Sequence, residues 1–143
     1  MRAGAFSMTS EADQLAPMRA WLREALAGEG IPRQECAALL LAVGELCANA
    51  IKHSYEGRAG QSIRVSLEIS DESVSIQVED WGKPFDARQY VPPDLDALPE
   101  RGLGLYFVHS IADRVSCDTE RSQGTRWTLI KYRPSPSAPA ASS

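Results

Sequence analysis

Apolar and polar residues recur along this chain with two periods, one typical of helices and the other typical of strands. Pro17 fits the first turn of a helix, where its missing N–H costs little. Gly28 and Pro32 are typical of the end of that helix. The pattern predicts three helices, over about residues 15–27, 33–53 and 104–114.

Strict alternation of apolar and polar side chains predicts four strands that form two hairpins. The first hairpin turns at Ser70–Ser73 and the second at Ser122–Gly124. Residues 1–10 do not alternate, so they are either a short edge strand or a weakly ordered end. The four predicted strands cover about residues 61–70, 74–80, 115–120 and 125–132.

This order of elements predicts an α+β fold, a two-layer sandwich with helices packed on one face of a mostly antiparallel mixed sheet. Residues 11–133 are expected to form one domain. Residues 83–100 contain four prolines and no periodicity, and a loop of this length is often a functional lid. Residues 134–143 contain only proline, alanine and serine, which predicts a disordered tail.

Composition and charge narrow the expected partners and compartment. The net charge of -4 argues against a direct nucleic-acid partner. We see no apolar run near the roughly 18 residues that span a membrane, and no signal peptide. Cys36, Cys47 and Cys117 lack the pairing of a disulfide framework or a zinc cluster. We expect all three to be small buried hydrophobes in a reducing cytoplasm.

The second predicted helix carries a polar face beside its apolar stripe. Glu45 and Asn49 are four residues apart and therefore point the same way, with Lys52 and His53 nearby on the wheel. An amide oxygen can bind Mg²⁺, and a carboxylate can accept a proton from an attacking hydroxyl. Taken alone, the pair is equally an ordinary solvated face. His53 could simply end the helix, and Lys52 could approach a phosphate or face water.

The next candidate is an acid that interrupts a strand pattern. Asp80 has the same parity as the inward Val78, so the pleat points its carboxylate toward the core. A buried unpaired charge is expensive, and a ligand donor is one possible partner. Gly82 permits a sharp turn, after which Pro84 and Phe85 lead into the long loop. Alone, Asp80 also fits an ordinary turn at a strand end.

A glycine-rich segment precedes the third predicted helix. Gly102 and Gly104 allow backbone N–H groups and the helix dipole to face an anion, and Arg101 could contact a phosphate. A lone G-x-G is a weak signal. The dinucleotide-binding fingerprint and the P-loop signature are both missing, which disfavours these two nucleotide folds.

Together the three motifs resemble the GHKL ATPase superfamily, which groups gyrase-type, heat-shock-chaperone-type, mismatch-repair and histidine-kinase ATP-binding domains. They are most similar to the bacterial anti-sigma factor serine kinases. The resemblance rests on Glu45–His53, Asp80–Phe85 and Arg101–Leu105, with Gly124-Thr125 before the last strand, and it covers about residues 11–133. One departure is the poorly marked N-terminal strand, which leaves edge pairing and a homodimer open.

The resemblance implies a role for each matched position. Asn49 would hold Mg²⁺, and Glu45 would be the general base of phosphoryl transfer. Asp80 would accept from the adenine amino group, with room made by Gly82 and support from Thr125. The remaining nucleotide-binding positions would be Lys52, His53, Pro84, Phe85, Arg101, Gly102, Leu103, Gly104 and Leu105. Of these, Gly102, Gly104 and Leu105 would meet the phosphates through their backbone, and residues 83–100 would be the ATP lid.

The resemblance also implies a function and partners. The chain would be a cytoplasmic anti-sigma factor and protein serine/threonine kinase that acts in stress-response transcription. It would sequester a sigma factor and phosphorylate an antagonist, the anti-anti-sigma protein. The alternative is a non-catalytic, ATP-dependent binding module with the same fold. Glu45 favours the kinase, since a pure binder need not keep a base beside its metal ligand.

Overall fold

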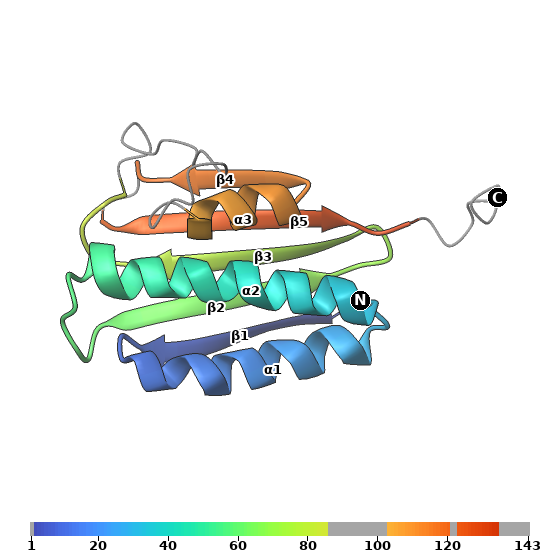
Figure 1. The fold of residues 1–143 in the computed structure, drawn as a ribbon, viewed down its shortest axis with the longest axis horizontal. Coiled ribbons are helices and arrows are strands. Elements are labelled where there is room, and N and C mark those ends of the chain that lie inside the picture. The colour runs from blue at the N-terminus through green and yellow to red at the C-terminus, as the bar shows by residue number, and fades with distance from the viewer. Residues whose placement is uncertain (1, 86–102, 121–122, 135–143) are drawn as a thin grey trace.

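The computed structural model describes residues 2–85, 103–120 and 123–134 and has the predicted α+β architecture. Helices and strands follow the expected order, with one additional strand at the N-terminus (Figure 1). The strands are β1 (Arg2–Thr9), β2 (Ser62–Ile69), β3 (Ser73–Asp80), β4 (Arg114–Asp118) and β5 (Thr125–Tyr132). The helices are η1 (Ala12–Gln14, 3-10), α1 (Leu15–Gly28), α2 (Arg33–Asn49), η2 (Ala50–Ser54, π) and α3 (Leu103–Ile111).

The five strands form one sheet in the order β1-β2-β3-β5-β4. All four pairings in the described part of the chain are antiparallel, so the expectation of a mixed sheet was wrong in that detail. The three α-helices lie together over one face of the sheet (Figure 1). β3 occupies the middle of the sheet, and its last residue, Asp80, pairs with Ile63 of β2 and Thr125 of β5.

Strand β1 is an edge strand that the hydrophobic pattern did not mark. It pairs with β2 from Arg2–Ile69 to Thr9–Ser62. One inward position is Gly4, which has no side chain, and an added Cβ there would lie 3.6 Å from the Trp21 ring of α1. Trp21 also packs against Phe6, with ring centroids 5.7 Å apart. The side chain of Trp21 on α1 thus lies beside the position where an apolar strand residue was expected.

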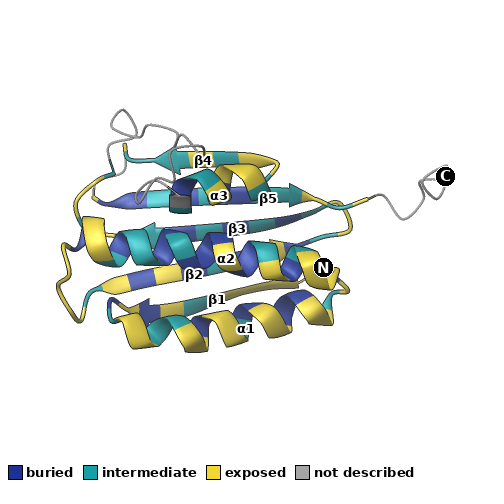
Figure 2. Cartoon of the chain, viewed as in Figure 1, coloured by how far each residue is buried: buried dark blue, intermediate teal, exposed yellow. Residues whose placement is uncertain are grey.

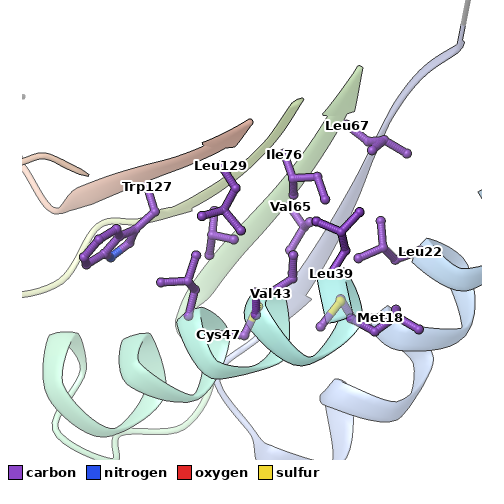
Figure 3. Packing of buried hydrophobic residues seen from close by; sticks show 14 of the residues in the cluster. Met18, Leu22, Leu39, Val43, Cys47, Val65, Leu67, Ile76, Trp127 and Leu129 are labelled. Atoms are coloured by element: carbon purple, nitrogen blue, oxygen red, sulfur yellow. The ribbon is translucent and has the colours of Figure 1, made fainter. Parts of the chain in front are cut away.

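The core lies between the sheet and the helices. Figure 3 shows Met18 and Leu22 of α1 beside Leu39 and Val43 of α2, facing the inward residues of the strands. The exposed residues of α1 and α2 form the outer surface of the helical layer (Figure 2). This burial of one apolar face per element is the principal stabilising term of the fold.

The three cysteines differ in burial. Cys36 and Cys47 are buried as predicted, whereas Cys117 on β4 is only partly buried, because β4 is an edge strand. Burial raises the pKa of Cys47 to about 12 and that of Cys117 to about 11, with Asp118 and Asp80 adding to the latter. Both thiols are therefore protonated at neutral pH.

Two helix ends differ from the sequence prediction. The second helix has nearly the predicted length, but it changes from α to π at Ala50. The third helix ends at Ile111 rather than near residue 114, because Asp113 joins the sheet margin: its N–H donates to Ile130 (2.9 Å) and its carboxylate accepts from the Tyr132 N–H (2.6 Å).

Among the described residues, Arg33–Ser54 is one helix that by length and average composition is apolar enough to cross a membrane, although it contains no continuous apolar run of that length. Half of that window is buried inside this fold, which a core helix also produces.

Candidate functional site

A buried carboxylate at the end of β3 forms the centre of the site. Asp80 is 3% exposed and points inward, as strand parity predicts. Ser54 Oγ donates to one carboxylate oxygen (2.8 Å), and the Gly82 N–H donates to the other (3.0 Å). Two donors fix the plane of the carboxylate and compensate its burial. Asp80 is therefore a rigid, oriented acceptor.

The turn after Asp80 rests on the π-helical segment η2 and the residue that follows it. The Lys83 N–H donates to the Ser54 carbonyl (2.7 Å), and the Trp81 N–H donates to the Tyr55 hydroxyl (2.7 Å). A Cβ on Gly82 would lie 2.3 Å from the Ser54 oxygen, a distance that no side chain tolerates. Glycine is required at this position because two backbones meet there.

The other side of Asp80 is bounded by the start of β5. Thr125 is 1% exposed, pairs with Asp80, and its Oγ1 accepts from the Phe85 N–H (2.9 Å). The Phe85 ring packs on Trp127 at 5.1 Å, which holds the chain after the turn against β5. Gly124 has φ +81, and a Cβ there would lie 2.0 Å from the Asp80 carbonyl oxygen. The segment before β5 therefore lies directly against the backbone at Asp80.

Glu45 and Asn49 lie on α2, the helix that continues into η2. Both side chains are partly buried. α3 packs beside α2 (Figure 1), and a Cβ on Gly104 would lie 2.5 Å from Glu45 Oε2. The first turn of α3 thus lies directly on the Glu45 carboxylate. The structure brings the first and third sequence motifs into contact here.

Lys52 and His53 differ from the other two polar residues of the first motif. Their side chains are exposed. They lie in the π turn, in which the Tyr55 N–H donates to the Ala50 carbonyl five residues back (3.0 Å). A wheel with one constant step no longer describes the chain beyond Asn49. The π turn instead buries Ser54 against Asp80.

Part of the third motif lies outside the described residues. This applies to Arg101, Gly102 and residues 86–100 of the predicted lid, as well as to the side chain of Leu103. Gly104 and Leu105 lie in the first turn of α3, where Leu105 is buried in the core. Pro84 is exposed beside the described start of the predicted lid.

Sequence reasoning missed Ser54 and Tyr55, two buried residues that contact the Asp80 turn. Tyr55 is 3% exposed, and its hydroxyl donates to the Ser62 carbonyl (2.5 Å). The sequence signal was weak, because both residues directly follow Lys52-His53 and look like a solvated helix end. Only the spatial proximity of η2 and the β3 end identifies them.

The chemistry of the donor set fits a ligand with an N–H donor and a hard cation. Asp80 supplies a buried acceptor, while Asn49 and Glu45 supply oxygen atoms, which hard cations prefer. Within the described ranges, no group of three or more His, Cys, Asp and Glu side chains could hold a metal ion.

Known proteins are similar to this chain in sequence. The family model described as "Histidine kinase-like ATPase domain" matches residues 8–131. A protein named "Serine-protein kinase RsbW" from Bacillus pumilus is 29% identical over 113 residues, covering 72% of this chain and 68% of the relative. A protein of the same name from Staphylococcus epidermidis is 33% identical over 101 residues, covering 64% and 62% respectively.

The fold is also found in a solved structure. The crystal structure of the RsbU and RsbW domains of a Mycobacterium tuberculosis protein superposes with a TM-score of 0.69 at 22% identity. The match covers 94% of this chain and 34% of that one. At this identity the likeness establishes the fold, with helices on one face of an antiparallel sheet.

Proposed function

Because the chain belongs to the histidine kinase-like ATPase family, we propose that it is an ATP-dependent protein serine/threonine kinase that acts as an anti-sigma factor. It would bind a sigma factor and phosphorylate a serine or threonine of an antagonist, the anti-anti-sigma protein. The relatives named "Serine-protein kinase RsbW" support the kinase activity. A cytoplasmic location and a homodimer belong to the same proposal.

The buried end of β3 is the proposed base-binding site. Asp80 accepts a hydrogen bond from the exocyclic amino group of adenine, and Ser54 and Gly82 hold its two oxygens in place. Thr125 supports this contact from β5. Pro84 and Phe85 lead the chain from the base toward the lid, residues 83–100.

The α2 end and the α3 start form the proposed phosphate site. Asn49 binds Mg²⁺ through its amide oxygen. Backbone N–H groups of Gly102, Gly104 and Leu105 would meet the phosphates at the positive end of the helix dipole, with Arg101, Lys52 and His53 supplying cationic or donor side chains. When bound, ATP with Mg²⁺ supplies the transferable phosphoryl group. Glu45 accepts the proton of the attacking hydroxyl, and positioning contributes most of the rate.

The observation that carries the kinase proposal is the contact of Glu45 with Gly104. It puts a carboxylate between the proposed metal ligand Asn49, one turn away on α2, and the proposed phosphate cradle on α3. A general base must be within hydrogen-bond reach of the group it deprotonates, close to the transferred phosphoryl group. A module that only binds ATP has no need of a carboxylate there.

The proposal is tested by measuring ATP binding and phosphoryl transfer separately. The protein is incubated with labelled ATP, Mg²⁺ and a candidate antagonist domain. Asp80→Asn and Asn49→Ala should each abolish ATP binding. Glu45→Ala should keep ATP affinity within about threefold and lower transfer by about 10²-fold or more, as expected for loss of a general base.

Matched controls are available on the exposed surface. Asp71→Asn in the β2–β3 turn and Glu24→Ala on α1 make the same chemical changes at exposed positions. Unchanged ATP affinity in both Asp80→Asn and Asn49→Ala would refute the site assignment. ATP binding without phosphate transfer to any antagonist would favour the non-catalytic binding module instead.

A further inference from the structure

The hydrogen-bonded pairing of β2 with β3 ends at Ile63 and Asp80, beside the residue that follows η2. The register pairs Ile63 with Asp80, so one further step would pair Ser62 with Trp81. In that place the Tyr55 hydroxyl accepts from the Trp81 N–H (2.7 Å) and donates to the Ser62 carbonyl (2.5 Å). A side chain thus replaces the direct backbone bond between the two strands.

This insertion separates the two strands immediately after Asp80. Trp81 ends its pairing with β2 without leaving a buried N–H unsatisfied. The following residues turn away over Ser54, whose carbonyl accepts from the Lys83 N–H and whose hydroxyl donates to Asp80. Three hydrogen bonds therefore join the residue pair Ser54–Tyr55 to the turn 80–83.

We propose that the pair Ser54–Tyr55 is a positioning clamp that sets the selectivity of the Asp80 turn for a purine carrying an exocyclic amino group. This inference deepens the proposed function and rests on it. Ser54 orients the carboxylate, and Tyr55 fixes the backbone from which that carboxylate projects. Neither residue needs to touch the nucleotide, since both act through Asp80.

The chemistry of the clamp supports this role. Tyr55 is 3% exposed, and its burial raises the pKa of the hydroxyl above the usual value, although the hydrogen bond from the Trp81 N–H acts in the opposite direction. The hydroxyl therefore stays protonated and keeps its donor for Ser62. An ionised carboxylate only accepts hydrogen bonds, so Ser54 donates to Asp80, and a ligand amino group would donate to it in the same way. A site with fixed acceptors rejects ligands that lack the matching donor.

The test compares ATP with inosine triphosphate (ITP), which has a carbonyl in place of the amino group. The wild type should bind ATP more tightly than ITP. Tyr55→Phe and Ser54→Ala should each weaken ATP binding by about tenfold or more, the effect expected when a buried hydrogen bond is lost. ITP affinity should change by less than about threefold, so the ATP:ITP ratio falls. Ser54→Thr keeps the hydroxyl and should restore the ratio.

Tyr132→Phe is the matched control, because it removes the same hydroxyl from a side chain that is 50% exposed. A merely structural role for the clamp would weaken ATP and ITP equally, which would overturn the inference. If Tyr55→Phe does not fold, Ser54→Ala and Ser54→Thr give the same comparison. An unchanged ATP:ITP ratio in both folded variants also overturns it.

The proposed function fails in a distinguishable way. If Asp80→Asn leaves the ATP:ITP ratio of the wild type unchanged, Asp80 does not read the base, and both proposals fall. If Asp80→Asn abolishes the selectivity while Ser54→Ala and Tyr55→Phe preserve it, the nucleotide site stands and only the clamp is refuted.

Discussion

Replacing Gly124 with alanine should destabilise the protein through the close contact at Asp80. Gly124 has φ +81, a conformation that costs an L-residue roughly 1–2 kcal/mol. The added Cβ would also lie 2.0 Å from the Asp80 carbonyl oxygen and 2.6 Å from Trp81 Cα. Both contacts are with backbone, so no side chain can rotate to relieve them. The start of β5 must instead move away from the end of β3.

The size of the second effect follows from what that movement breaks. It opens the rung between Asp80 and Thr125, both of which are buried. Losing one or two hydrogen bonds there costs about 0.5–1.5 kcal/mol each, and more where a buried group stays unsatisfied. Together with the backbone conformation, we expect Gly124→Ala to lower the free energy of unfolding by about 1.5–5 kcal/mol.

Gly57 offers a control with the same backbone conformation and none of the crowding. Its φ is +80, and a Cβ there would meet nothing within 4 Å. Gly57→Ala should therefore cost only about 1–2 kcal/mol. Urea unfolding followed by circular dichroism at 25 °C measures both variants. Equal losses, within about 0.5 kcal/mol, would refute the close approach of the β5 start to Asp80.

Two further predictions concern α3 and the buried thiol. In a Glu45→Ala background, Gly104→Ala should stabilise the protein by about 0.5–1 kcal/mol, because alanine favours a helix over glycine. In the wild type it should give less or no gain, because the new Cβ meets Glu45 Oε2. A double-mutant cycle measured by urea unfolding tests this, and a coupling energy of zero would contradict the contact. Because the pKa of Cys47 is raised from 9.0 to about 12, its thiol binds a proton more tightly in the folded than in the unfolded chain. Its contribution is complete below pH 9 and is lost as pH rises toward 12, at up to about 1.4 kcal/mol per pH unit. Cys47→Ala should flatten this decline in unfolding free energy, and an identical decline in the variant would refute the assignment.

Periodicity predicted the parts of the fold in which one face is buried along the whole element. The alternation in residues 61–80 placed β2 and β3 correctly and pointed Asp80 inward. It does so because shifting a strand by one residue would move all of its inward side chains to the outer face. It did not mark β1, since the inward Gly4 contributes no apolar side chain and the ring of Trp21, from another element, lies beside it. Contacts between distant segments leave no local pattern.

The same limit applied to the candidate site. Glu45, Asn49 and Asp80 stood out because acids and amides beside apolar stripes are conspicuous. Ser54 and Tyr55 were missed, because a hydroxyl satisfied by a distant carboxylate or carbonyl looks like an ordinary helix end. The change from α to π at Ala50 was also invisible, since no residue type requires it.

The π turn in η2 has a consequence for the evolution of the site. A bond that spans five residues instead of four is equivalent to one extra residue inserted into an otherwise regular helix. The π turn absorbs that residue, so the side chains beyond it keep the directions they would have on a regular helix. Ser54 therefore reaches Asp80 although one more residue separates it from the core stripe of α2. Deleting one residue between Ala50 and Ser54 would restore an unbroken α-helix and leave the Ser54–Asp80 contact in place.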